Sequence, residues 1–394
     1  MITRFGSLFA GHVDLDGYGL EAPPVNERWL PDERLVGVFD KATRIAQTMD
    51  RHGFDVLWLA EHHFQREGYE CIPNILMLAV HLAHLTRSIK FGCGFNITPM
   101  WHPLRLAEDY ATADYLTGGR VIFGVGRGYH TREVETFGAP MLDADANRAL
   151  FEEQVEIMLK AFNERAFSHQ GQHYTLPPRV PYRGYHLQDL TLVPRPVTRP
   201  VECWQPIVSA RPHGLEFMAR NGIKGMIGGG AAAGGANDKT VVAWRDTLVR
   251  HGRDAQLGED LIIGLSFHIA DSEEQAIEEA TPYFEEWMKM FAPLGFVRGL
   301  SPEQVEAIAD PARARSAALP TLRQAVDAGS WLVGPPARVI EQLMALQERY
   351  PGLQEVQVGQ VVGTPQHVIL EQLERFAREV MPTFRAQARQ PVTA

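Results

Sequence analysis

Strand-like and helix-like segments alternate regularly through the first 164 residues of the chain. Short apolar runs typical of strands lie at 2–10, 54–61, 89–98 and 121–127, and helix-like segments lie at 35–49, 73–87, 102–118 and 145–164. In the first helix-like segment, apolar residues recur every three or four positions, and Gly53 ends it. This alternation predicts parallel strands joined by right-handed helical crossovers.

The same order resumes in the second half of the chain. We expect further strands at 206–209, 224–227, 261–270 and 353–358, and helices at 212–221, 238–252, 272–291, 335–350 and 366–387. Two stretches break the pattern: a small, proline-rich β-excursion near 165–200, and residues 293–330, which we interpret as an insertion that forms a lid over one end of the barrel. Eight strands alternating with helices predict an α/β fold, a (β/α)8 TIM-type barrel, in a single domain over residues 1–394.

Charge and cysteine content narrow the class of protein. The formal charge of −10 argues against nucleic acid and anionic membrane surfaces as partners. Cys71, Cys93 and Cys203 are far apart, which indicates neither a disulfide framework nor a zinc-binding spacing. The chain has no apolar run approaching 18 residues and no recognisable signal peptide, so we expect a cytoplasmic protein.

The segment LWLAEHHF, Leu57 to Phe64, is the strongest candidate for the catalytic site. It reads as a strand buried on both faces that ends in Glu61, His62 and His63. In a parallel barrel the chemistry lies at the carboxyl ends of the strands. A purely structural histidine is the alternative. Adjacent residues of a strand point to opposite faces and do not readily converge on one ion, and no HExxH helix is present, so we expect no metal site.

The segment GVGRG, Gly124 to Gly128, predicts a ligand-binding turn. Its spacing is GxGxG rather than the GxGxxG of a Rossmann fold, so binding of NAD(P)H in the Rossmann manner is not expected. Small residues at a strand end let a planar ligand lie against the backbone, and Arg127 offers a bidentate fork for a phosphate. The alternative is a surface arginine in a tight turn.

Two other segments are candidates for ligand contact. Gly94-Phe95 interrupts a strand, which indicates either a plain bulge or close approach of a ligand. Ser209 to Gly214 lies between a strand and a helix, where free backbone N–H groups attract anions and Arg211 adds positive charge; an ordinary turn is the alternative. The glycine- and alanine-rich loop 228–236 could close on a phosphate, although mobility alone would explain its composition.

Four segments together resemble the bacterial luciferase-like flavin monooxygenase family: LWLAEHHF, FGCGFNITPMWHP, LAEDYATADYLTGGRVIFGVGRG and QVVGTPQHVILEQLERFAREVMPTF. The resemblance implies a (β/α)8 barrel that binds FMN as FMNH2. It implies that the flavin reacts with molecular oxygen to a C4a-peroxide and that one oxygen atom enters a small organic substrate. It also implies a separate NAD(P)H-dependent flavin reductase as partner and a homodimer formed through the early helices.

The resemblance also assigns roles to individual residues. His62 falls on the catalytic histidine, and Gly94-Phe95 falls on a non-prolyl cis peptide beside the isoalloxazine. Arg127, followed by Gly128, falls on the arginine that holds the FMN phosphate. The segment containing Ala210, Arg211 and Gly214 falls on the phosphate loop. Gly126 stands where the luciferase α subunit has a reactive cysteine, so that thiol is absent here.

Three functions remain open from the sequence: an FMNH2-dependent monooxygenase, a deazaflavin-dependent hydride-transfer enzyme on the same barrel, and a flavin-binding barrel without turnover. For the monooxygenase, we expect a small apolar substrate such as an aldehyde, a ketone or a compound with an activated carbon atom, since the flavin adduct must be kept from water. Candidates for lining the pocket are Phe95, Trp101, Phe296 and Trp331.

Overall fold

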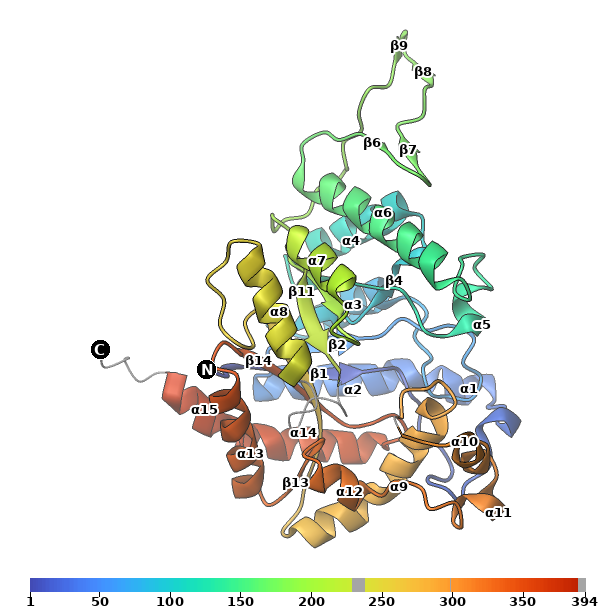
Figure 1. Ribbon diagram of the computed structural model, residues 1–394, viewed down its shortest axis with the longest axis vertical. Coiled ribbons are helices and arrows are strands. Elements are labelled where there is room, and N and C mark those ends of the chain that lie inside the picture. Colours follow the sequence, from blue (N-terminus) through green and yellow to red (C-terminus); the bar gives the residue numbers. More distant parts are fainter. Residues whose placement is uncertain (229–237, 298, 389–394) are drawn as a thin grey trace.

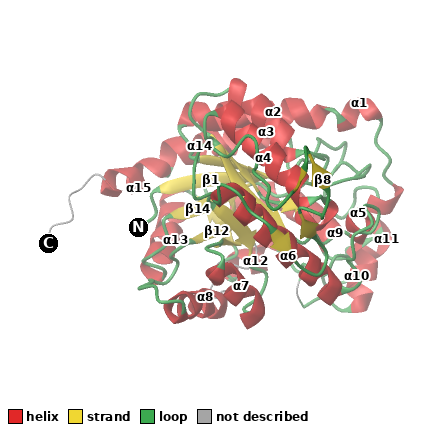
Figure 2. Ribbon diagram, turned by 90° about the horizontal axis from the view of Figure 1, so that it is seen from above, coloured by secondary structure: helices red, strands yellow, loops and turns green. Residues whose placement is uncertain are grey.

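Eight parallel strands close into a barrel in the computed structural model, which describes residues 1–228, 238–297 and 299–388 (Figures 1 and 2). The barrel strands are β1 (Arg4–Phe9), β2 (Val56–Leu59), β3 (Lys90–Cys93), β5 (Val121–Gly126), β10 (Cys203–Pro206), β11 (Lys224–Ile227), β12 (Leu261–Ile269) and β14 (Glu355–Gly359). Pairing of β10 with β5 closes the ring. The predicted (β/α)8 barrel is therefore confirmed. Most of the glycine- and alanine-rich loop, 229–237, lies outside the described residues.

Helices surround the barrel (Figure 2). They are α1 (Asp32–Leu35), α2 (Gly37–His52), α3 (Ile75–His84), α4 (Pro103–Thr117), α5 (Thr131–Val134), α6 (Ala144–Asn163), α7 (Pro212–Arg220), α8 (Asp238–Arg250), α9 (Glu273–Phe291), α10 (Pro302–Ile308), α11 (Pro311–Ala314), α12 (Leu322–Asp327), α13 (Pro336–Arg349), α14 (Gln366–Glu379) and α15 (Met381–Ala388), with short 3-10 turns at Val25–Glu27 and Thr98–Met100. None of the helices in the described ranges is both long and apolar enough to cross a membrane.

Three segments differ from their predicted form. The fifth barrel strand is Cys203–Pro206 rather than 206–209, because residues 203–206 pair with β5 and β11 while Val208 and Ser209 are exposed. The predicted strand 89–98 is divided into β3 and β4 (Asn96–Ile97), which pairs with β5. An additional strand, β13 (Trp331–Gly334), pairs with the long β12 and follows directly on the predicted insertion.

The two interruptions of the barrel pattern have different structures. Residues 165–200 contain two small hairpins, β6 (His169–Gln170) with β7 (Thr175–Leu176) and β8 (Pro181–Tyr182) with β9 (Tyr185–His186), which project away from the barrel (Figure 1). The second segment carries α10, α11 and α12. In both views, α10 and α11 lie on the same side of the molecule as α5, which follows β5.

The interior of the barrel is filled by a cluster of large side chains. It is formed by Val56, Trp58, Ile122, Trp204, Met226 and Ile262, with Phe95 packed against it. Trp58 and Trp204 meet edge to face with ring centroids 5.9 Å apart. A Cβ atom on Gly92 would lie 2.2 Å from Cε3 of Trp58, so the indole occupies the space that a side chain at position 92 would need. Because the barrel is packed, a ligand site has to lie at one of its ends.

Candidate functional site

His62 lies just beyond the carboxyl end of β2 and is buried. Its backbone N–H donates to the carbonyl of Ile72 at 3.0 Å, which fixes the chain at this point. Both ring nitrogens have polar partners. Nδ1 lies 3.2 Å from Oε2 of Glu133, and Nε2 lies 3.1 Å from the hydroxyl of Tyr129 and 3.3 Å from Oε1 of Glu70. The ring is therefore held between two buried carboxylates.

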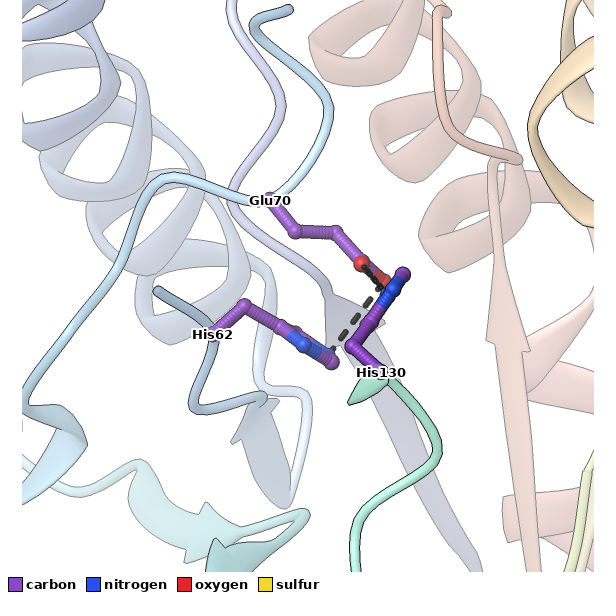
Figure 3. Close-up of side chains that lie close together, drawn as sticks. All are labelled: His62, Glu70 and His130. Carbon is purple, nitrogen blue, oxygen red and sulfur yellow. Dashed lines mark hydrogen bonds and ion pairs between the residues drawn. The ribbon is translucent and has the colours of Figure 1, made fainter. Parts of the chain in front are cut away.

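Glu70 connects His62 to a second histidine (Figure 3). Its Oε1 accepts a 2.7 Å hydrogen bond from the Tyr129 hydroxyl, and its Oε2 lies 2.9 Å from Nε2 of His130. All four side chains of this cluster come from two loops: His62 and Glu70 follow β2, whereas Tyr129 and His130 follow β5. The fold thus assembles the cluster from residues about 60 positions apart.

The hydrogen bonds indicate that His62 carries protons on both nitrogens. The single hydroxyl proton of Tyr129 is directed to Glu70, which leaves the Tyr129 oxygen free to accept from Nε2 of His62. Burial favours the neutral ring, but the carboxylates of Glu70 and Glu133 outweigh it and raise the pKa of His62. Burial opposes ionisation of Glu133, yet its hydrogen bond to His62 lowers the pKa of that carboxyl. The site can therefore present a proton at Nε2.

Glu61 and His63, the sequence neighbours of His62, do not contribute to this cluster but hold the surrounding backbone. Glu61 accepts from the backbone N–H of Ile97 at 2.7 Å and from the indole N–H of Trp101 at 2.8 Å, and its Oε1 lies 3.1 Å from Nε2 of His63. These contacts hold the segment after β4 in place. Glu61 and His63 thus support the loop, while His62 points into the buried cluster.

The Gly94–Phe95 peptide lies beside two glycines of β5. It is cis, and the Gly94 N–H donates to the carbonyl of Leu59 at 2.7 Å. A Cβ atom on Gly124 would lie 1.9 Å from the Cys93 carbonyl oxygen, and one on Gly126 would lie 3.2 Å from Cβ of Phe95. The strand can therefore approach this peptide only because it lacks side chains there, so this edge is lined by glycine backbone.

Three arginines gather where β5, α6 and α7 meet. Burial lowers the pKa of Arg127, and the positive charges of Arg148 and Arg211 lower it further. Nε of Arg148 is buried without a hydrogen-bond partner among the described residues. Glu152 supplies an opposing negative charge and also lies 2.8 Å from Nε2 of His213. Clusters of arginine side chains commonly bind phosphate.

The start of α7 adds backbone donors to this cluster. Arg211 is the N-cap residue, no side chain caps the helix, and Gly214 lies in its first turn. Ala210 and Arg211 lie at the surface, in the turn after β10. Backbone N–H groups at a helix start favour an anion. The arginines and this helix therefore fit a phosphate group, and the glycine edge at Gly94 fits the planar ring of a flavin.

Gly128 joins the two clusters. Its φ of +83° and the close packing of Val134, which would lie 2.5 Å from an added Cβ, both require glycine. The turn it makes follows Arg127 directly and leads into Tyr129 and His130.

The predicted lining residues have separate surroundings. Trp101 donates to Glu61, and Phe95 packs against the barrel interior. Phe296 packs edge to face against Tyr129, with ring centroids 5.0 Å apart. Trp331 instead lies in β13 and packs against Phe284 of α9.

Five residues of the site were not predicted from the sequence: Glu70, Tyr129, His130, Glu133 and Arg148. The only local signal for these residues was their closeness in the sequence to predicted elements. Tyr129 and His130 directly follow the GRG turn, and Arg148 lies one turn into the helix after the fourth predicted strand.

The chain is similar to known flavin-dependent monooxygenases. A family model described as luciferase-like monooxygenase matches residues 4–351. The chain is 25% identical over 368 residues to the oxygenase component of the flavin-dependent trigonelline monooxygenase of Acinetobacter baylyi, covering 91% of this chain and 93% of that protein. It is also 34% identical over 129 residues to the uncharacterized protein y4vJ of Sinorhizobium fredii; this match covers 33% of the chain and only 35% of that protein.

A solved structure shares the fold over nearly the whole chain. It is the oxygenating constituent of 3,6-diketocamphane monooxygenase, a type II Baeyer-Villiger monooxygenase from a plasmid of Pseudomonas putida, in complex with FMN. The two structures superpose with a TM-score of 0.68 at 21% identity, covering 97% of this chain and 98% of the other.

Proposed function

Because this chain belongs to the luciferase-like monooxygenase family, we propose that it is the oxygenase component of a two-component monooxygenase that uses FMNH2. The observation that carries the proposal is the position of His62. It is a buried histidine held between two carboxylates, and the loop after β5 links it to a cluster of three arginines. A proton donor and an anion site on neighbouring loops match the two ends of a reduced flavin mononucleotide.

In this proposal the chain's residues hold the flavin and control one proton. Arg127, Arg148 and Arg211, with the N–H groups at the start of α7, bind the phosphate. The Gly94–Phe95 peptide lies against the ring. When bound, the reduced flavin supplies the electrons that activate oxygen. His62 would hold the proton at Nε2 that the reaction needs, with the Glu70 carboxylate and the Tyr129 hydroxyl keeping the ring protonated and in place.

The partners follow from the two-component arrangement. A separate NAD(P)H-dependent flavin reductase supplies FMNH2, and molecular oxygen is the second substrate. The compound that is oxygenated is a small aldehyde, a ketone or a compound with an activated carbon atom. A homodimer through the early helices is part of the proposal, because Met77, Tyr115 and Leu116 expose apolar surface on α3 and α4. The three free cysteines fit a cytoplasmic location.

The decisive experiment follows the fate of oxygen. Protein loaded anaerobically with FMNH2 is mixed with 18O2 and a panel of aldehydes, ketones and activated carbon acids, while oxygen uptake, hydrogen peroxide and labelled product are measured. We expect one labelled oxygen atom per product. In His62→Ala, product formed per FMNH2 should fall and hydrogen peroxide should rise. Unchanged coupling would remove His62 from the mechanism.

The same experiment, repeated with a reduced deazaflavin in place of FMNH2, separates the other two functions. A deazaflavin-dependent hydride-transfer enzyme would bind its cofactor and reduce or oxidise substrate without consuming oxygen. A barrel that only stores flavin would bind FMN tightly and form no product with any member of the panel. Either result would contradict the monooxygenase.

A further inference from the structure

The side chains of His62, Glu70 and His130 converge on one point (Figure 3). Each offers one ligand atom, these atoms all lie within 4.8 Å of one another, and all three residues are buried. We propose that this cluster is a binding site for a divalent transition metal ion, for which Zn²⁺ is the probe. The sequence predicts no metal site, because adjacent His62 and His63 point to opposite faces of a strand and no HExxH helix is present. The second histidine ligand comes instead from the loop after β5.

The spacing of the ligand atoms suits a small ion. Nε2 of His62 lies 3.3 Å from Oε1 of Glu70, and Nε2 of His130 lies 2.9 Å from Oε2. Zinc binds histidine nitrogen and carboxylate oxygen at about 2.0–2.2 Å, so tetrahedral ligands are separated by about 3.3–3.6 Å. Because the three ligand atoms lie within 4.8 Å of one another, side-chain shifts of up to about 1.5 Å would bring them to this separation and admit the ion.

The surroundings of His62 resemble those of a metal ligand. Metal-bound histidines commonly donate their other ring N–H to a carboxylate, which fixes the ring and raises its basicity. Nδ1 of His62 has such a partner in Glu133, and Glu133 in turn accepts a 2.9 Å hydrogen bond from Nε2 of Gln65. Nε2 is thereby aimed at Glu70 and His130.

The chemistry of the ligands selects the class of metal. Two imidazoles and one carboxylate suit Zn²⁺, Co²⁺, Ni²⁺ or Fe²⁺, whereas Ca²⁺ and Mg²⁺ require six or more oxygen ligands. Three protein ligands leave further positions for water. The hydroxyl of Tyr129, 3.1 Å from Nε2 of His62 and 2.7 Å from Glu70, is placed to hydrogen-bond such a water or to act as a ligand itself.

Metal and proton compete for the same atom. The ion takes the lone pair of His62 Nε2, so the proton at that nitrogen is released to solvent as the metal binds. A metal-bound protein could no longer donate from His62, and Zn²⁺ should inhibit oxygenation. This consequence rests on the proposed function, whereas the binding itself does not.

The test measures binding without flavin. Chelator-treated protein is titrated with Zn²⁺ by calorimetry and with Co²⁺ by visible absorption. We expect one ion per chain with a micromolar or lower Kd, proton release, and a rise in melting temperature. Removing the hydrogen-bond partner of a metal ligand weakens metal binding by about 10–100-fold, so Glu133→Gln should raise the Kd by that factor. Glu70→Gln and His130→Ala change the ligands themselves and should raise the Kd by at least roughly as much.

His169→Ala is the matched control, because His169 forms a similar, largely buried pair with Glu153 but has no third ligand nearby in the described ranges. It should leave Kd unchanged. Melting curves without metal establish that each variant is folded. If His130→Ala does not fold, Glu70→Gln still tests the site, because glutamine has the same shape as glutamate. Absence of stoichiometric binding, or equal Kd in the folded ligand variants, would overturn the site. Zn²⁺ binding in a protein that forms no labelled product would instead contradict the proposed function alone.

Discussion

Phe296 lies against Tyr129 with the two rings nearly perpendicular, at an interplanar angle of 77°. Tyr129 contacts both His62 and Glu70, so the segment between α9 and α10 reaches the buried cluster through this aromatic pair. Phe296 is itself 43% exposed, which places it between the cluster and solvent. The segment interpreted from sequence as a lid therefore has one defined contact with the site.

The first prediction concerns this contact. Phe296→Ala removes an aromatic ring that shields Tyr129 from water, and exclusion of water protects reactive flavin–oxygen species from side reactions. We expect hydrogen peroxide formed per FMNH2 to rise several-fold while flavin affinity stays the same. Val193→Ala, which shortens an exposed side chain in the β-excursion, is the control. An unchanged peroxide yield in Phe296→Ala would show that this ring does not limit water access.

The second prediction concerns Arg148. If this arginine shares the phosphate with Arg127, replacing either by Ala should weaken FMN binding by about 1.5–3 kcal/mol, the range for a hydrogen bond to a charged group. Quenching of FMN fluorescence gives the Kd. Arg105→Ala, which removes an exposed arginine paired with Glu108 on α4, should have no effect. Normal FMN affinity in Arg148→Ala would remove it from the phosphate site.

The site was predictable from sequence only where a motif is contiguous. His62 ends an apolar run and Arg127 follows a glycine-rich strand, so both were identified. The cis peptide at Gly94–Phe95 is present as the resemblance implied. Glu70 and Glu133 were not identified, because their roles depend on two loops packing together. Nothing local distinguishes a buried glutamate beside a histidine from an exposed one.

The barrel was predictable because each strand is a short apolar run between helix signals. The ends of the strands were less predictable than the strands themselves, since they depend on which residues pair with the neighbouring strands. Apolar residues continue past Pro206 with Ile207 and Val208, so it is pairing that fixes the strand at 203–206. Trp204 pairs with Gly124 of β5 and Lys224 of β11, and Pro206 pairs with Met226 of β11. Likewise, β13 exists because β12 is long enough to pair with both β13 and β14.

The third prediction concerns the barrel interior. Gly92→Ala would place a Cβ atom 2.2 Å from the buried ring of Trp58, which cannot move without disturbing Trp204. Overpacking a filled core costs about 1–3 kcal/mol or more, so the free energy of unfolding should fall by at least that amount in urea titrations. Gly37→Ala is the control: its Cβ would contact nothing within 4 Å, and alanine in a helix should be neutral or stabilising. Equal stability of Gly92→Ala and the parent chain would contradict the packing.

The last prediction concerns Glu355, at the opposite end of the barrel from His62. It is 3% exposed and lines a cavity of about 270 Å³ together with Arg4, Trp58 and Trp204. Its Oε2 lies 3.2 Å from Nε of Arg4, while its Oε1 has no hydrogen-bond partner in the described part of the chain. Burial outweighs the attraction of Arg4 and raises the pKa of Glu355 to about 7.

The sign of the effect on stability follows from that pKa. The folded state binds this proton more tightly than the unfolded state does. The stability that Glu355 protonation contributes is therefore fully present below the ordinary glutamate pKa and is lost as pH rises through about 7. The shift corresponds to about 3 kcal/mol. Glu355→Gln, which stays neutral, should therefore be more stable than the parent chain at pH 8 by about 1–3 kcal/mol, with the difference disappearing toward pH 5. Urea unfolding at both pH values measures it, with the exposed Glu274→Gln as control. A difference that does not change with pH would mean that Glu355 is ionised in the folded protein throughout this range, because Arg4 then compensates its burial.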